Sequence, residues 1–202
     1  MHHEAIARYR DMLDHWVLDP EALCWTVTFP LTGTLSPKEV VTRMGMRPRD
    51  LGTSTDEDNP IEEGYFLIEQ AGSGIVTYDM GGYGRFSRQI HDALTPDARH
   101  WCVQWDSYNL GLSYYQGDGG GGGWDIEYFE EHPSETVIAA LGPLVKYADL
   151  FQRYNLDDDE YGAIYIRALC LAVVEWESGI CLDREWLYRP HPVLDLPARF
   201  MM

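Results

Sequence analysis

The chain has 202 residues, and its 33 acidic side chains outnumber 15 basic ones, for a formal net charge of -18 at pH 7. Hydrophobic residues make up 45% of the chain and aromatic residues 13%, which is enough apolar surface for a core and argues against intrinsic disorder. Only two basic residues are lysines and no basic run exists, which disfavours direct binding of nucleic acid.

The first half of the chain predicts two helices, three strands and one long loop. Ser36-Pro-Lys-Glu39 has an N-cap serine, an early proline and a glutamate three residues on, so a capping box starts the second helix. Apolar spacing, β-forming residues and turn residues place the other elements. In chain order we expect a helix over 3–18, a strand over 22–29, a helix over 36–44, a polar loop over 47–63, and a hairpin with strands over 65–69 and 75–78.

The second half predicts three more strands and a helical segment. Residues 124–129 alternate apolar and acidic side chains, as a strand with one buried face does. Residues 158–176 are apolar nearly all round in their middle, so this helix is expected to pack centrally. In chain order we expect a helix over 86–94, strands over 100–105, 110–115 and 124–129, helices over 135–141, 144–154 and 158–176, and a short turn from Asp183.

Neighbouring strands joined by short turns predict an α+β fold, with an antiparallel sheet of about six strands, helices packed on one face and a C-terminal helical segment. One domain over 1–202 is expected because no long linker divides the chain. Its parts are an N-terminal helix (1–20), a sheet-forming part (21–130), a helical part (131–190) and a tail (191–202).

Five consecutive glycines, Gly119 to Gly123, are expected to form a loop between two strands. A phosphate-binding loop would need backbone N–H groups at a helix N-terminus with a basic residue nearby. Here acidic residues flank the run and a strand follows it. A single Gly-Asp stretch is also a weak signal for calcium, because such repeats bind it as stacked arrays.

No catalytic signature, metal-binding spacing or cofactor motif is found, so we predict no catalytic residue, no metal and no cofactor. The least implausible catalytic cluster is His100 with Cys102 on the same strand face and Asp106 after them. Three of the four cysteines lie in apolar runs, and all four are expected to be free and buried. The four are Cys24, Cys102, Cys170 and Cys181.

Aromatic residues near turns are the most suggestive feature for binding, since Tyr, Trp and Arg dominate binding hot spots. Tyr83, Trp105 and Tyr108 are expected to be more exposed than the other aromatics. With nearby charged residues they give a candidate partner-binding set: Tyr83, Arg85, Trp105, Tyr108, Asp118, Asp125 and Glu127.

Several segments in the same order resemble a family of uncharacterised actinobacterial proteins catalogued as a domain of unknown function. The likeness spans residues 20–190 and implies a small acidic α+β domain. The glycine run and the length of the 47–63 loop depart from the pattern. The matching pieces are Cys24-Trp-Thr-Val-Thr-Phe29, the helix from Ser36 to Gly45, Tyr65-Phe-Leu-Ile-Glu69, Gly82-Tyr-Gly-Arg-Phe-Ser87, the Trp101 to Tyr115 hairpin and the segment from Gly179 to Leu187.

The acidity and the turn-borne aromatics predict a non-enzymatic protein-interaction domain, immunity- or antitoxin-like, that inhibits a basic or nucleic-acid-binding partner. In one variant it is a nucleic-acid mimic that occupies a DNA- or RNA-binding cleft. The alternative is a small-molecule sensor or enzyme with a pocket near His100 and Asp106. No apolar leader or membrane span is seen, so a cytoplasmic location is expected.

Overall fold

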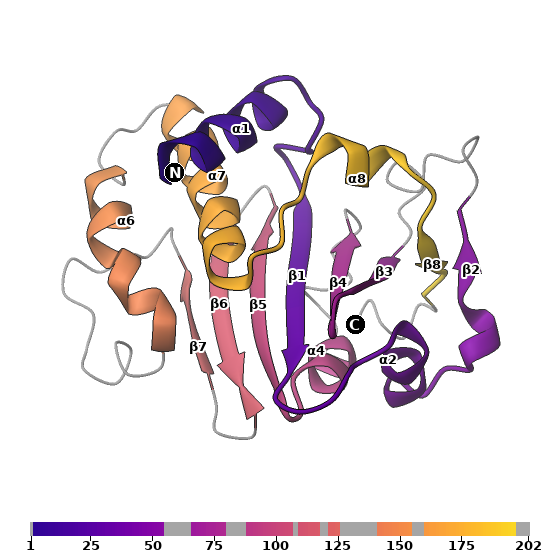
Figure 1. The fold of residues 1–202 in the computed structure, drawn as a ribbon. Coiled ribbons are helices and arrows are strands. Elements are labelled where there is room, and N and C mark those ends of the chain that lie inside the picture. The colour runs from indigo at the N-terminus through magenta and orange to yellow at the C-terminus, as the bar shows by residue number, and fades with distance from the viewer. Residues whose placement is uncertain are drawn as a thin grey trace.

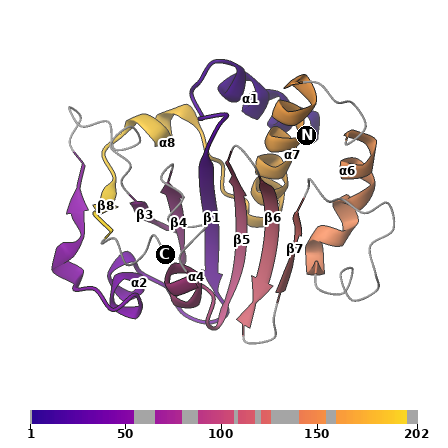
Figure 2. The same cartoon turned by 180° about the vertical axis from the view of Figure 1, so that it is seen from behind.

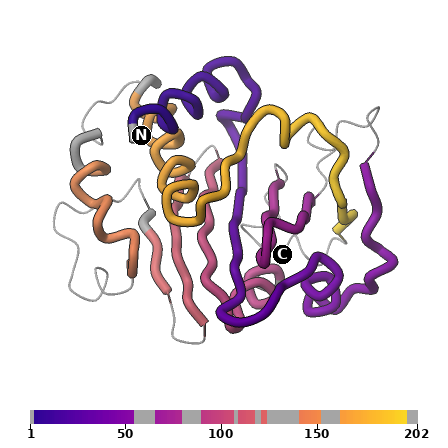
Figure 3. Tube along the Cα trace, viewed as in Figure 1, coloured from indigo at the N-terminus to yellow at the C-terminus, as the bar shows by residue number. Residues whose placement is uncertain are grey.

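The computed structural model describes residues 2–54, 66–79, 88–106, 109–117, 121–125, 141–154 and 160–196, which Figure 3 traces in colour. Within them the chain forms one antiparallel sheet of eight strands in the order β2-β8-β3-β4-β1-β5-β6-β7 (Figure 1). The strands are β1 (Leu23–Pro30), β2 (Gly52–Thr53), β3 (Phe66–Ala71), β4 (Gly74–Asp79), β5 (Ala98–Trp105), β6 (Leu110–Gln116), β7 (Gly121–Asp125) and β8 (Pro192–Leu194).

Helices in the described part lie on both faces of this sheet. Helix α2 begins where the capping box predicts, because the Ser36 hydroxyl accepts a hydrogen bond from the backbone N–H of Glu39 at 3.2 Å. The helices are α1 (His2–Asp14), α2 (Pro37–Arg43), α4 (Arg88–Leu94), α6 (Ala148–Tyr154), α7 (Glu160–Ser178) and α8 (Arg184–Tyr188), with 3-10 turns η1 (Pro48–Asp50) and η4 (Gly142–Tyr147).

The first face of the sheet is apolar and packs against α1, α7, α8 and the η4–α6 segment (Figure 1). Strand residues Trp25 and Val27 are buried here with Trp101 and Val103 of β5. Every residue from Ala168 to Val174 is fully buried, as the apolar sequence of α7 predicts. This face holds the main hydrophobic core.

The second face carries polar side chains, because alternate residues of a strand point to opposite sides. Thr26 lies between Thr77 of β4 and Cys102 of β5, and Thr28 lies beside His100. Seen from the other side, α2 and α4 lie at one end of this face (Figure 2), where they bury a smaller apolar cluster with β3 and β4. The polar residues of the face are nevertheless buried: Cys24, Thr26, Thr28, Thr77, Asp79, His100 and Cys102.

The broad class is therefore α+β with an antiparallel sheet, as predicted, but two details were wrong. The described sheet has eight strands instead of about six, because β2 and β8 add an edge that pairs segments about 140 residues apart in sequence. The helices also do not share one face, since α2 and α4 pack opposite α1 and α7.

The glycine run also differs from the prediction. Gly121 to Gly123 are part of β7 and pair with residues 113 to 115 of β6, so only the start of the run precedes the strand. A Cβ atom on Gly123 would lie 2.7 Å from the Cβ of Ser113, and one on Gly121 would clash with the backbone and ring of Tyr115. Glycine is needed here because the two strands approach each other closely, so the run is more than a flexible connection.

Several predictions fall outside the described residues. These are residues 55–63 of the loop expected over 47–63, the glycine-rich bend at 80–84, the end of the strand expected over 124–129, and nearly all of the helix expected over 135–141.

Candidate functional site

Most of the predicted partner-binding residues cannot be placed. Tyr83, Arg85, Tyr108, Asp118 and Glu127 lie outside the described residues. Asp125 ends β7, where its backbone pairs with that of Gly111. The remaining residue is Trp105.

The expected exposure of Trp105 is wrong. Only 2% of this residue is exposed, and its indole N–H donates a hydrogen bond to the carbonyl of Asp19 at 3.1 Å. Trp105 ends β5 with its side chain on the apolar face, where the core covers it. Its proximity to a turn in the sequence did not reveal this, because the alternation of the strand decides which way the side chain points.

The proposed catalytic cluster does not assemble either. His100 and Asp106 are separated by nearly the whole of β5, which at ~3.3 Å per residue puts them roughly 20 Å apart. The carboxylate of Asp106 instead accepts hydrogen bonds from the backbone and side-chain N–H groups of Asn109, at 2.8 and 3.2 Å. Asp106 stabilises a turn, so no shared pocket with His100 is supported.

His100 and Cys102 do share a face, as predicted, but both are buried in the polar second face of the sheet. The Nδ1 atom of His100 lies 2.8 Å from the Thr28 hydroxyl. Burial, and secondly the nearby His91, lower the pKa of His100 to about 3. His100 is therefore neutral and packs under α4. These are the properties of a structural residue, and they do not suit a residue that transfers protons.

The thiols of this face are also protected. The sulfur atoms of Cys24 and Cys102 lie 3.9 Å apart as free cysteines. The hydrogen bond to Cys102, together with burial, raises the pKa of Cys24. Cys24, Cys102 and Cys170 are buried, as predicted, while Cys181 is only partly buried. The raised pKa of Cys24 disfavours its reactive thiolate form, and both sulfur atoms of the pair are buried, so the pair fits a packing role.

A different residue, Trp16, has the features of a binding group. It follows α1 in a Schellman motif, in which the N–H of Val17 donates to the carbonyl of Met12 and the N–H of Trp16 donates to that of Leu13. Glycine usually takes this left-handed position, yet Trp16 has a φ of 54° and is 67% exposed. The fold gains little from a strained, exposed tryptophan, which points to a role in binding.

Tyr188 is a second exposed aromatic residue, with 65% of its surface accessible. It is the last residue of α8, which lies beside the segment that links α1 to β1 at the same end of the molecule (Figures 1 and 2). Helix α8 is also joined to α1 itself by an ion pair of 3.3 Å between Arg184 and Asp11. Trp16 and Tyr188 therefore belong to one end of the molecule, which we call the α1–α8 end.

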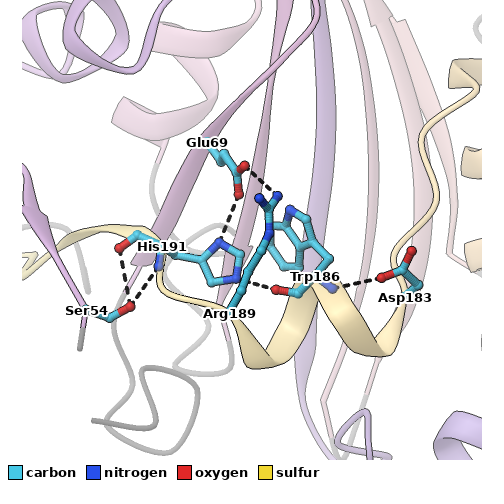
Figure 4. Close-up of polar contacts among 6 residues, drawn as sticks. All are labelled: Ser54, Glu69, Asp183, Trp186, Arg189 and His191. Carbon is cyan, nitrogen blue, oxygen red and sulfur yellow. Dashed lines mark hydrogen bonds and ion pairs between the residues drawn. The ribbon is translucent and has the colours of Figure 1, made fainter. Parts of the chain in front are cut away.

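A buried hydrogen-bond network fixes α8 on the sheet (Figure 4). His191 is fully buried, and its ring nitrogens face the carboxylate of Glu69 at 2.9 Å and the carbonyl of Trp186 at 2.5 Å. Arg189 holds the other oxygen of Glu69 at 2.6 Å. Both ring nitrogens of His191 therefore have a partner, one a carboxylate and the other a backbone carbonyl.

This network is structural, since both ring nitrogens of His191 are already used. The backbone N–H of His191 also donates to the hydroxyl of Ser54, which ties β2 to the same corner. The ring of Trp186 packs against Tyr78 in an edge-on contact. The residues on either side of Tyr188 are thus anchored within the protein, and its own ring is directed to solvent.

The α1–α8 end is acidic. No lysine or arginine occurs from Asp11 to Glu21. The two arginines near α8 are neutralised within the protein, Arg184 by Asp11 and Arg189 by Glu69. Three further carboxylates at this end are exposed to solvent: Asp14, Glu21 and Glu185.

Sequence reasoning missed both Trp16 and Tyr188. Trp16 fits the apolar spacing of the helix expected over 3–18, and that spacing indicates a buried position. A signal was present, because the helix ends in Asp14-His15-Trp16 with no glycine to take the left-handed position. Nothing comparable marks Tyr188, whose exposure follows from the way in which α8 docks.

Among the described residues, no group of three or more His, Cys, Asp or Glu side chains is placed to hold a metal ion. No helix in the described segments is long and apolar enough to cross a bilayer.

Comparison with protein-family models, with curated proteins and with solved structures finds no match in any of the three, so the family resemblance stays a prediction.

Proposed function

We propose that this protein is a non-enzymatic, acidic interaction domain that acts as an immunity- or antitoxin-like inhibitor of a basic protein. The α1–α8 end is its binding surface, with Trp16 and Tyr188 as anchors. The observation that carries the proposal is Trp16, which is exposed in a backbone conformation that favours glycine. Strain that the fold does not require is a feature of functional positions.

Charge supports a basic partner. The formal net charge is -18, and the arginines near the anchors are occupied by carboxylates of the same chain. Exposed carboxylates around two aromatic side chains would steer a basic surface into contact and exclude acidic ones. If the basic surface of the partner is a nucleic-acid-binding cleft, these carboxylates occupy the positions that the phosphates of the nucleic acid would take.

The two anchors are also fixed in position before a partner binds. The Schellman motif fixes Trp16, and the His191 network fixes the end of α8. Rigid aromatic anchors lose little conformational entropy on binding, which leaves more of the contact energy for affinity.

The experiment compares three baits in affinity capture: wild type, Trp16→Gly, and Leu31→Ala. Leu31 is a matched control because it is also an exposed apolar residue, at 47%, but it follows the opposite end of β1. Captured proteins are then purified and tested for a one-to-one complex by light scattering and calorimetry. We expect a basic partner whose affinity falls with salt and falls at least ~30-fold with Trp16→Gly.

Trp16→Gly separates binding from folding. Glycine relieves the left-handed strain, so its melting temperature should equal or exceed that of wild type. Leu31→Ala should bind as wild type does. A partner that binds Trp16→Gly unchanged, or a complex insensitive to salt, would show that the α1–α8 end is not the inhibitory surface.

A further inference from the structure

A cavity of about 530 Å³ lies between the N-terminal part of α1, the η4–α6 segment and α7, away from the α1–α8 end. Figure 1 shows α6 beside α7 with the N-terminus close to both. His3, which lines the cavity, lies near the start of α1, and Trp16 follows the end of that helix, so the two residues are roughly 20 Å apart at ~1.5 Å per residue. The volume suits a small organic molecule. The cavity is lined by His3, Ile6, Lys146, Tyr147, Leu150, Tyr165 and Trp176.

The walls are aromatic and mainly apolar. Tyr165 and Trp176 are eleven residues apart on α7, which is close to three helical turns, so both face the same side. Tyr147 comes from η4 and packs against Trp176, with ring centroids 5.7 Å apart and planes inclined by 34°. Such rings offer flat surfaces for stacking, so a planar apolar ligand fits these walls.

One residue that lines the cavity, Lys146, carries a positive charge. Lys146 is one of only two lysines in the chain, and its side chain is 59% exposed at the rim. One of its three donors reaches Glu177 at 2.7 Å, which leaves two for a ligand. The Glu177 carboxylate is only 9% exposed and also accepts a hydrogen bond from the Tyr147 hydroxyl, so it is shielded from the cavity.

Two cations already lie over the aromatic walls. The Lys146 ammonium is 5.1 Å from the centre of the Tyr147 ring, and the Arg10 guanidinium is 5.6 Å from that of Tyr165. These two positive charges would repel a cationic ligand and attract an anionic group.

We propose that this cavity binds a planar aromatic anion, with its rings stacked on Tyr147 and Trp176 and its acidic group on Lys146. The assignment is independent of the inhibitory surface, because no residue is shared between the two sites. It gives the domain a small-molecule site in addition to its partner-binding end.

The test uses two fluorescent probes that differ in one acidic group: 8-anilinonaphthalene-1-sulfonate and its neutral counterpart, N-phenyl-1-naphthylamine. We expect saturable one-to-one binding of the sulfonate to the folded protein and at least ~5-fold weaker binding of the neutral probe. Lys146→Gln should weaken the sulfonate ~5-fold and leave the neutral probe unchanged. Lys38→Gln removes the same charge from the exposed second lysine and should alter neither affinity.

A natural ligand of this class is then sought by displacement. Indole-3-acetate should displace the sulfonate probe, and tryptamine, which has the same ring with an amine, should not. Circular dichroism checks that both lysine variants are folded, which is expected because Lys146 is largely exposed. Equal binding of the two probes, an equal effect of the two lysine variants, or displacement by tryptamine alone would overturn the proposal.

Discussion

The two faces of the sheet are stabilised in different ways. The first face presents tryptophan, valine and leucine to α7 and gains stability from the burial of apolar area. The second face buries threonine, cysteine and histidine, which gain little from leaving water and need hydrogen-bond partners instead. The pairs Thr26 with Thr77 and Thr28 with His100 supply such partners.

The contrast teaches that buried position alone does not identify a site. His100 is a buried, titratable residue close to a cysteine, which is the composition of a catalytic centre, yet its contacts are those of a packed structural group. The exposed aromatic residues Trp16 and Tyr188 carry more information about function, because the fold has no need to expose them.

The largest effect is expected on the apolar face. Leu169→Ala, in the fully buried centre of α7, removes apolar contacts and leaves a cavity, so it should lower the free energy of unfolding by about 4 kcal/mol. Urea denaturation followed by circular dichroism measures this. A loss below ~1 kcal/mol would mean that α7 is not the centre of the main core.

An intermediate and pH-dependent effect is expected on the polar face. His100 has a folded pKa of about 3, lowered from 6.5, so the unfolded chain binds more protons between these values and stability falls as pH falls. The loss from pH 7 to 4 is on the order of 3 kcal/mol. His100→Gln cannot be protonated, so its stability should fall correspondingly less over this range.

The control for His100 is His15→Gln, because His15 is exposed on α1's C-terminal turn. This variant should keep the pH dependence of the wild type. Denaturation midpoints at several pH values make the comparison. Identical slopes for wild type and His100→Gln would show that His100 does not carry the acid sensitivity of this face.

The smallest effect concerns the threonine pair on the polar face. The hydroxyls of Thr26 and Thr77 are 2.7 Å apart and both residues are buried. Thr26→Val or Thr77→Val alone leaves one hydroxyl without its partner and should cost about 1 to 2 kcal/mol. The double variant should cost less than the sum of the two. Strictly additive losses would indicate that the hydroxyls are not coupled.

Local elements followed from the sequence wherever neighbouring residues determine them. The strand around Trp25, the helix capped by Ser36 and the hairpin ending in β4 lie where they were expected. The central helix α7 was also predicted, because a run that is apolar on all sides needs burial on all sides. Spacing, capping and turn chemistry are short-range effects and can be read from a single chain.

Features that depend on contacts between residues far apart in the sequence were decided by the tertiary structure. Pairing of β2 with β8 joins segments that carry no strong strand signal, and the close approach of β6 draws the glycines into β7. The left-handed turn after α1 leaves Trp16 outside the core, and the packing of α1, α6 and α7 creates the cavity beside Lys146. The sequence determined which segments are helices and strands, because their signals are local. Which side chains are left exposed was decided only when those segments packed together.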